Sequence, residues 1–285
     1  MKISPVISPN ELTEIINNKN VVLIDAGSGK PAHERYLEKH IENAFYVDLN
    51  EDLAEIPADA KNGGRHPLPS PEKFADVLQR VGIKENSHLI VYDDKNGSNA
   101  AARFWWMARA AGLENVQVLD GGLQQTEKFG LPITQKIPVA DEVELIKFKN
   151  WELPVINLDQ IESYVSAESN ILVDVRETER YNGETEPIDL VAGHIPGAIN
   201  LPFKNNLDEN GFFRKPEELK KQFKEVVGNA NNIAVHCGSG VTACHTILAM
   251  DYAGLPIPTF YVGSWSEYSR NYKPIATQPA NNLTQ

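Results

Sequence analysis

Both cysteines of the chain lie in one short stretch that passes from a predicted strand to a predicted helix. In NIAVHCGSGVTACHTILAM, residues 232–250, an apolar run ends at Cys237, and a loop of small residues leads to a helix starting near Val241. Peptide N–H groups of a tight loop and of a helix N-terminus stabilise an anion placed among them. They would favour a thiolate, so Cys237 is a candidate nucleophile. Gly238 and Gly240 permit the close turn.

Three other roles for Cys237 compete with this one. A buried structural cysteine is the commonest fate of a free thiol, but the order strand, Cys, Gly-x-Gly, helix favours chemistry. A cysteine phosphatase needs an arginine six residues later to grip phosphate, and Ala243 stands there. A zinc site is opposed by the spacing, which offers no CxxC or HxxxH pair. Its ligands would be His236, Cys237, Cys244 and His245.

Cys244 is predicted to be a small core residue. It follows Cys237 by seven positions, about 10 Å along one helix, which is too far for a direct sulfur–sulfur bond. Two cysteines in 285 residues do not make a disulfide framework. This cysteine content favours a reducing compartment, and we expect the protein to be cytoplasmic.

The chain repeats itself at an offset of about 140–155 residues, which indicates a duplicated domain. Each pair of stretches shares its order of apolar run, small or charged loop and apolar-periodic segment. The pairs begin at Asn20 and Asn170, at His88 and Asn232, and at Val116 and Pro258.

Short apolar runs alternate with helical patterns in each copy, for example at 70–83 and 215–228. This alternation predicts an α/β fold in which a mainly parallel sheet is flanked by helices in each copy. We place the N-terminal domain at 1–135, a linker at 136–153, the C-terminal domain at 154–276 and a flexible tail at 277–285.

The overall composition narrows the possible partners. The formal net charge is −12, and the chain has neither a basic tract nor an apolar stretch long enough to span a bilayer. Nucleic acid and membranes are therefore not expected to be partners.

The motifs CGSGVTA at 237–243, GHIPGA at 193–198 and GSWSEY at 263–268, together with the duplication, resemble two-domain sulfurtransferases of the rhodanese family. This resemblance implies two rhodanese-like domains, with the active loop in the C-terminal copy. It also implies that Cys237 takes a sulfane sulfur, becomes a persulfide, and passes the sulfur to cyanide or to a thiol such as that of thioredoxin. No metal or organic cofactor is implied.

The N-terminal copy has Asp93 where Cys237 would fall. We therefore expect this copy to be inactive and to supply one wall of the site. A non-enzymatic alternative is a persulfide carrier or interaction module, because fold alone does not fix function.

The sulfur donor is predicted from the loop. Family members that use thiosulfate carry cations just after the cysteine, whereas the neutral CGSGVT resembles the branch that uses 3-mercaptopyruvate. The resemblance assigns Ser239 to the sulfur or to proton relay, although a turn residue would look the same. It assigns Arg180 to the donor carboxylate. A second arginine expected before GHIPG is absent, and Ile188 and Asp189 stand near that point, so thiosulfate remains an alternative donor.

The remaining candidates follow from the same resemblance. His66 is matched to a histidine that faces the substrate, Arg176 is a possible replacement for the missing cation, and Trp265 and Tyr268 are possible pocket residues. The acid expected to partner Ser239 aligns with Asn50, which cannot accept a proton. Asp48 and Asp52 flank Asn50 as substitutes. The predicted substrate-binding set is Arg180, Gly238, Gly240, Val241, Thr242, His66, Arg176 and Trp265.

Overall fold

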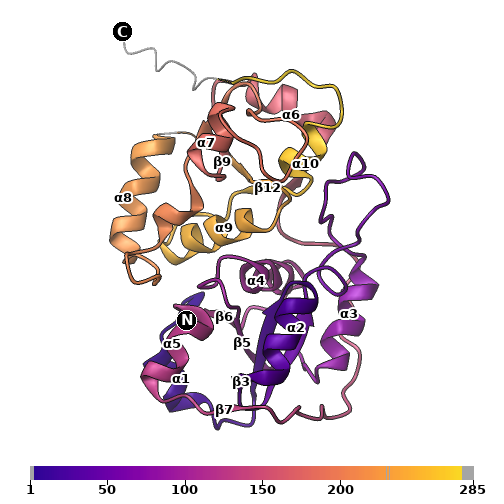
Figure 1. Cartoon of the computed structure of the whole chain (residues 1–285), viewed down its shortest axis with the longest axis vertical. Coiled ribbons are helices and arrows are strands. Elements are labelled where there is room, and N and C mark those ends of the chain that lie inside the picture. The colour runs from indigo at the N-terminus through magenta and orange to yellow at the C-terminus, as the bar shows by residue number, and fades with distance from the viewer. Residues whose placement is uncertain (1–2, 229, 231, 278–285) are drawn as a thin grey trace. The chain divides into compact units, whose positions relative to one another are not determined.

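A computed structural model describes residues 3–228, 230 and 232–277, which form two compact units (Figure 1). The first unit comprises the described residues up to Glu55, with Leu68–Leu153 and Asp208–Phe213. The second comprises Ile56–Pro67, Pro154–Leu207 and the described residues from Arg214 onward.

Two short segments therefore group with a unit other than the one expected from the repeat. The predicted N-terminal domain, 1–135, contains Ile56–Pro67, which belongs to the second unit. The predicted C-terminal domain, 154–276, contains Asp208–Phe213, which belongs to the first. The proposed linker, 136–153, groups with the first unit, and residues 278–285 of the proposed tail lie outside the described residues.

The first unit is built on a five-stranded parallel sheet in the order β1-β6-β5-β2-β4. A separate two-stranded sheet is formed by β3 and β7, which pair in antiparallel orientation. The strands are β1 Val6–Ile7, β2 Val21–Gly27, β3 His40–Ile41, β4 Ala44–Asp48, β5 His88–Tyr92, β6 Val116–Leu119 and β7 Ile133–Thr134. The helices are α1 Pro9–Ile15, α2 Gly29–Glu38, α3 Pro71–Arg80, α4 Ala100–Ala110, α5 Gly122–Thr126 and the 3-10 turn η1 Glu127–Phe129.

The second unit repeats this topology, with a five-stranded parallel sheet in the order β10-β9-β11-β12-β8. Its strands are β8 Val155–Ile156, β9 Asn170–Asp174, β10 Ala198–Asn200, β11 Asn232–His236 and β12 Thr259–Tyr261. Its helices are α6 Leu158–Val165, α7 Thr178–Asn182, the 3-10 turn η2 Phe203–Asn206, α8 Pro216–Val227, α9 Thr242–Tyr252 and α10 Ser264–Tyr268. The predicted duplicated α/β fold is confirmed.

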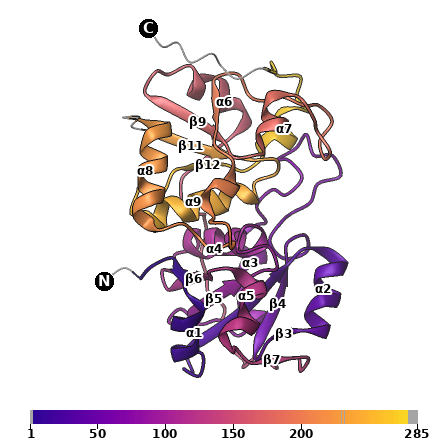
Figure 2. The same ribbon diagram turned by 60° about the vertical axis from the view of Figure 1, so that its left-hand side comes forward.

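Helices cover both faces of each sheet, as the short, continuously apolar strands require. In the second unit, α8 and α9 lie together on one face of the sheet, and α6 lies on the other (Figure 2). The helices predicted at 70–83 and 215–228 are observed as α3 and α8, and each has a proline in its first turn.

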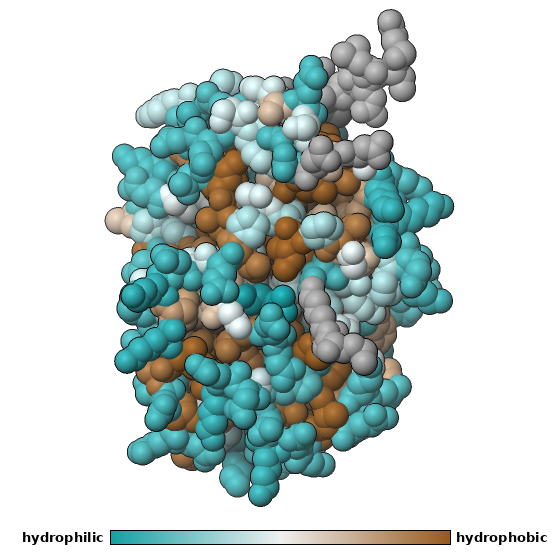
Figure 3. Space-filling view, turned by 180° about the vertical axis from the view of Figure 1, so that it is seen from behind, coloured by the Kyte–Doolittle hydropathy of each residue, from teal (hydrophilic) through white to brown (hydrophobic). Residues whose placement is uncertain are grey.

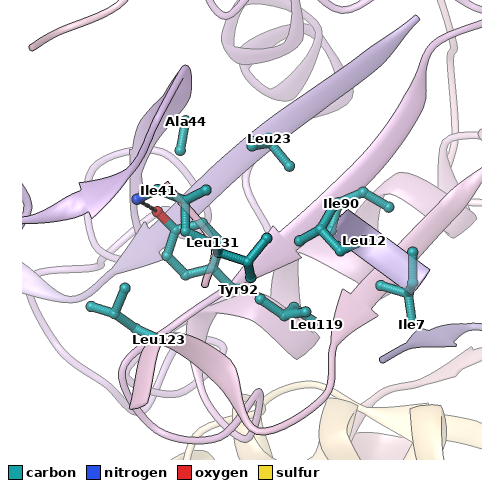
Figure 4. Packing of buried hydrophobic residues seen from close by; sticks show 10 residues of the cluster. All are labelled: Ile7, Leu12, Leu23, Ile41, Ala44, Ile90, Tyr92, Leu119, Leu123 and Leu131. Atoms are coloured by element: carbon teal, nitrogen blue, oxygen red, sulfur yellow. Dashed lines mark hydrogen bonds between the residues drawn. The ribbon is translucent and has the colours of Figure 1, made fainter. Parts of the chain in front are cut away.

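Each unit has its own apolar core. In the first unit, side chains from the sheet meet those of α1 and α5, and the Tyr92 hydroxyl accepts a hydrogen bond from Ile41 N at 3.0 Å (Figure 4). In the second unit, Ile161 of α6 and Trp265 of α10 pack on the corresponding face. Both copies therefore bury a complete core, although only the second carries the cysteine.

Hydrophilic side chains cover most of the face shown in Figure 3, with hydrophobic residues visible between them. Among the described residues, no helix has the length and apolar content needed to cross a bilayer.

The segment 208–213 is fixed to the first unit by a titratable contact. Phe213 N donates to Asp120 Oδ1 at 2.8 Å. Burial raises the pKa of Asp120 to about 6. The hydrogen bond from Phe213 N lowers this pKa, and the nearby charge of Asp208 raises it. A carboxyl with a raised folded-state pKa costs stability as pH rises from its unfolded value near 4 through about 6.

Replacing Asp120 with Asn should therefore stabilise the protein above pH 7, because the amide oxygen keeps the Phe213 hydrogen bond without the buried charge. We expect a gain of about 1–2 kcal/mol at pH 8, after allowance for partial exposure, and almost none at pH 4. Thermal unfolding of both proteins from pH 4 to pH 8 measures this difference. An equal shift in Tm at both ends of that range would contradict the assignment.

Candidate active site

Cys237 lies directly after β11, at the base of the loop 237–241. The N–H of Gly240 donates to Cys237 Sγ at 3.1 Å. Val241 and Thr242 complete the turn, and no described side chain caps the first turn of α9, which starts at Thr242. The loop therefore presents the Gly240 N–H to the sulfur, a donor that would favour an anionic sulfur.

The backbone of Cys237 is held by residues of α10. Cys237 N donates to Ser264 Oγ at 3.2 Å, and Cys237 O accepts from Trp265 N at 3.0 Å. Gly238 O accepts from Ser266 N at 2.8 Å. These contacts assign a positioning role to the GSWSEY motif. Sequence reasoning did not identify the two serines, although they flank the tryptophan that it did select.

The same helix holds the segment 56–67 against the second unit (Figure 1). Gly63 N donates to Glu267 Oε1 at 2.9 Å, and Arg65 N donates to Ser266 Oγ at 3.0 Å. Burial raises the pKa of Glu267, although hydrogen bonds from Tyr261 and Gly63 oppose the rise. Ser266 thus bonds to the active loop through its amide and to the segment through its hydroxyl.

His66, presented by this segment, meets the active loop. Its Nδ1 lies 2.9 Å from Ser239 Oγ, within hydrogen-bond distance. The partner of the serine is therefore a histidine. The aligned acid position, Asn50, and its flanking residues Asp48 and Asp52 lie in the first unit.

The carboxylates of Asp48 and Asp52 bond to other groups of the first unit. The Asp48 carboxylate accepts from Gly29 N and Asn50 N, each at 2.8 Å. Asp52 accepts from Asp48 N at 2.8 Å and pairs with Arg80 at 2.7 Å. These contacts account for both carboxylates as supports of the turn after β4.

A cluster of arginines surrounds Asp189, which lies near the point where the second arginine was expected. Its fully buried carboxylate lies 2.8 Å from Arg270 Nη1, 3.2 Å from Arg65 Nε and 3.5 Å from Arg180 Nη2. One negative charge therefore serves three guanidinium groups. Arg65 is the cation that sequence reasoning missed, although it directly precedes His66 in the chain.

Glu186 holds Arg180 from the other side. Its carboxylate accepts from Arg180 Nη2 at 2.8 Å and from Arg180 Nε at 3.1 Å. Burial opposes ionisation of Glu186, but the hydrogen bonds from Arg180 and from backbone N–H groups lower its pKa. Arg180 is thus fixed in the orientation in which it faces the loop.

Two guanidinium groups converge on Gly238. A methyl group built on this glycine would lie 3.1 Å from Arg65 Nη2 and 3.4 Å from Arg180 Nη2. The φ of Gly238 lies outside the left-handed region, in contrast to Gly240 at +74°. Only Gly240 therefore needs glycine for its turn, which corrects the sequence-based explanation for Gly238. The missing side chain at 238 leaves space beside the cysteine for the two cations.

Arg176 and Trp265 lie inside the unit, and their contacts do not support the predicted binding role. Arg176 is 1% exposed, bonds to Asp174 and Glu186, and lies 4.5 Å above the Trp265 ring. The Trp265 Nε1–H donates to Val191 O at 2.9 Å. Tyr268, the other predicted pocket aromatic, also belongs to the buried core.

Arg176 does influence the site indirectly. In the first copy, the arginine of the Glu-Arg-Tyr motif, Arg35, pairs with Asp25 of β2. In the second copy, Arg176 occupies the equivalent Asp174 instead. Burial opposes ionisation of Asp174, but the charge and hydrogen bonds of Arg176 lower its pKa. Arg180, the counterpart of Arg35, therefore turns toward Asp189 and the loop.

The first unit carries a corresponding loop with Asp93 at the position of Cys237. The Asp93 carboxylate accepts from Lys95 N and Gly97 N, each at 2.8 Å, and from Asn99 N at 3.0 Å. Its backbone oxygen accepts from Leu123 N at 2.9 Å, as that of Cys237 does from Trp265. An internal carboxylate thus fills the anion cradle of this copy.

The other thiol is separate from these groups. Cys244 is fully buried on α9, and its Sγ lies 3.6 Å from Gly240 O. Both cysteines are free. Within the described ranges, no three His, Cys, Asp or Glu side chains are grouped as a set of metal ligands.

Removal of the Ser266 hydroxyl tests how the segment 56–67 is held. Ser266→Ala deletes the acceptor for Arg65 N, so Arg65 and His66 should be less well positioned. We expect KM for the substrate of this site to rise about 5-fold, the value of one hydrogen bond, with little change in kcat. Ser269→Ala is the matched control, because its hydroxyl bonds to Trp265 O on the same helix. A similar rise in KM for that control would contradict the role.

Comparison with known proteins now bears on this site. A model described as the rhodanese-like domain matches residues 8–128 and 157–271, which cover most of both copies. The chain belongs to the rhodanese family. This explains why one fold occurs twice here, once with the cysteine and once with Asp93 in its loop.

Individual relatives agree on the reaction class. A probable 3-mercaptopyruvate sulfurtransferase of Pseudomonas aeruginosa is 38% identical over 246 residues, covering 85% of this chain and 86% of the relative. Thiosulfate sulfurtransferase of Rattus norvegicus is 35% identical over 250 residues, covering 86% and 82%. The solved structure of SseA from Escherichia coli, a 3-mercaptopyruvate sulfotransferase by its description, has a TM-score of 0.76 and 32% identity, covering 93% and 100%. This rhodanese is therefore an enzyme of the sulfurtransferase class.

Proposed function

We propose that this rhodanese moves a sulfur atom from 3-mercaptopyruvate to a thiol acceptor through a persulfide on Cys237. The observation that carries the proposal is the surroundings of one sulfur atom. Gly240 N–H donates to Cys237 Sγ, and the guanidinium groups of Arg65 and Arg180 converge beside the adjacent Gly238. A nucleophile next to a cationic site suits a small anionic donor.

The first half-reaction breaks the carbon–sulfur bond of the donor. The Cys237 thiolate attacks the donor sulfur, and a sulfur–sulfur bond forms. The electron pair of the broken bond goes to the donor carbon, which takes a proton and leaves as pyruvate. The donor sulfur is oxidised to the sulfane level, and the carbon is reduced by the same two electrons.

In the second half-reaction, the sulfane sulfur is attacked by an acceptor thiolate, which becomes a persulfide and releases the Cys237 thiolate. A protein thiol such as that of thioredoxin would serve as acceptor, and cyanide would serve in an assay. Splitting one transfer into two steps through a covalent intermediate is the advantage of a nucleophilic cysteine. The bound persulfide carries negative charge, which the same loop N–H groups would stabilise.

We assign the proton that the pyruvate carbon needs to the Ser239–His66 pair. The Ser239 hydroxyl lies on the loop that carries Cys237, and the His66 imidazole lies on the segment 56–67. Ser239 Oγ and His66 Nδ1 are 2.9 Å apart. A histidine takes up and releases protons near neutral pH, so it suits this exchange. Arg180, held by Glu186, is assigned to the donor carboxylate.

The proposed chemistry uses only side chains and substrates, so no metal or organic cofactor is required. Because the two cysteines are free and the reaction needs a thiolate, we also propose a reducing compartment, the cytoplasm.

Intact-mass measurement tests the proposal. Incubation with 3-mercaptopyruvate should add one sulfur atom to the protein and release one pyruvate, and a thiol acceptor should remove that sulfur. Cys244→Ala should still gain the sulfur, and Cys237→Ala should not. The absence of an adduct with 3-mercaptopyruvate, in a protein that gains one sulfur from thiosulfate, would instead assign thiosulfate as donor. No adduct from either donor would refute the persulfide.

A further inference from the structure

We propose that Arg65 is a specificity-determining residue, which supplies the second guanidinium of the donor site and binds the donor carboxylate together with Arg180. This inference rests on the proposed function, because it names the group that recognises that donor. It also explains how the site works with an acidic residue, Asp189, near the position expected for an arginine.

The guanidinium groups of Arg65 and Arg180 face the same space beside Gly238. Arg65 Nη2 and Arg180 Nη2 both lie within 3.4 Å of one point, a single bond away from the Cα of Gly238. That point is beside the nucleophile, because Gly238 follows Cys237 in the chain. A carboxylate has two oxygen atoms, and two guanidinium groups facing one space can each donate to one of them.

The arginines near Gly238 share buried carboxylates. Asp189 is fully buried and balances one charge, yet Arg65, Arg180 and Arg270 all lie within 3.5 Å of its carboxylate. Glu186 is shared in the same way between Arg180 and Arg176. Arg176 is neutralised by Asp174 at 2.6 Å, so Asp189 and Glu186 are two buried carboxylates that face the three guanidinium groups of Arg65, Arg180 and Arg270. The partly exposed Glu177 lies 3.9 Å from Arg180 and also pairs with Lys204. The excess of these cations over buried carboxylates favours the binding of one further anion.

The side chains of Arg65 and Arg180 are partly accessible to solvent, whereas that of Asp189 is not. The Arg65 side chain is 25% exposed and the Arg180 side chain is 11% exposed, whereas Asp189 is at 0%. The carboxylate thus lies behind the arginines and fixes their directions, while part of each guanidinium side chain faces solvent. Asp189 is accordingly a positioning residue, and Arg65 and Arg180 are the groups able to touch the donor.

Arg65 and Arg180 come from different copies of the sequence repeat. This residue lies on Ile56–Pro67, which belongs by sequence to the N-terminal copy and by its contacts to the second unit. Ser266 fixes the backbone of Arg65, and Asp189 fixes its side chain. The inactive copy would therefore supply half of the carboxylate site.

The test compares Arg65→Met with Arg214→Met, which removes an exposed arginine from the same unit. For Arg65→Met, we expect kcat/KM with 3-mercaptopyruvate to fall about 30–100-fold, mainly through KM. The kcat/KM of Arg65→Lys should lie between those of Arg65→Met and the wild type, because lysine keeps the charge without the planar pair of donors. Arg214→Met should be unchanged.

Two further readouts separate binding of the carboxylate from a general structural effect. Pyruvate, which keeps the carboxylate, should inhibit Arg65→Met more weakly than the wild type by a similar factor. Methyl pyruvate, which lacks the negative charge, should inhibit the two proteins equally. Discharge of a preformed persulfide to a thiol that carries no carboxylate should also be equal in both.

The outcomes distinguish this inference from the proposed function. If the wild type forms a persulfide but Arg65→Met keeps its KM and its pyruvate inhibition, Arg65 is not a carboxylate ligand. The same conclusion follows if the variant loses both half-reactions equally together with a lower Tm. If the wild type forms no persulfide from either donor, the proposed function itself fails.

Discussion

Replacing Cys237 with serine is expected to abolish sulfur transfer, with kcat/KM reduced at least about 10⁴-fold for 3-mercaptopyruvate and for thiosulfate alike. An alcohol ionises far less readily than a thiol, and an oxygen–sulfur intermediate would not pass the sulfur on as a persulfide does. The donor half of the site does not depend on the sulfur of this residue. Pyruvate should therefore still bind to the variant.

Pyruvate release and cyanide-dependent thiocyanate formation measure this loss. Cys244→Ala is the matched control, because it removes the other thiol of the chain from the adjacent helix α9. Its activity should remain within a few-fold of the wild type. Persulfide formation in Cys237→Ser, or its loss only in Cys244→Ala, would show that the nucleophile has been misassigned.

Replacing Gly238 with alanine is expected to impair donor binding severely while leaving the fold intact. The added methyl group would lie 3.1 Å from Arg65 Nη2 and 3.4 Å from Arg180 Nη2, in the space assigned to the donor carboxylate. We expect kcat/KM with 3-mercaptopyruvate to fall about 100-fold. Because the φ of Gly238 suits any residue, Tm should change by only a few degrees.

Gly240→Ala provides the contrasting control. Its φ is +74°, and the added methyl group would lie 2.4 Å from the carbonyl oxygen of Val262. We expect a loss of about 2–4 kcal/mol in the free energy of unfolding. Equal losses of stability in both variants would contradict the distinction between a glycine kept for space and a glycine kept for its turn.

The sequence was sufficient for the architecture, and it also singled out a candidate nucleophile. Alternation of short apolar runs with helical patterns predicted the parallel sheets, and the repeat predicted that they occur twice. Both predictions follow from local rules, because strand and helix periodicity and buried apolar faces are properties of neighbouring residues. Cys237 was found in the same way, since its strand, loop and helix are contiguous.

The charges of the site did not follow from such patterns. Two of the ion pairs of Asp189, those with Arg65 and Arg270, join residues more than eighty positions apart, and Arg65 and His66 belong to the other copy in sequence. The expected second arginine was sought at a fixed spacing before GHIPG, where the chain has an acid. Sequence spacing carries no information on a cation delivered by a distant loop.

What the sequence by itself determined is therefore the duplicated α/β fold, and it also singled out Cys237 as the candidate thiol and Asp93 as its counterpart, because each depends on contiguous residues. What only the tertiary structure decided is the partner of Ser239, the positions of Arg65 and Arg180 at Gly238, and the buried place of Arg176. Those outcomes depend on which charged groups share one buried carboxylate. The packing of distant segments decides which groups these are, because a buried ion pair is stable only where the fold brings both charged groups together.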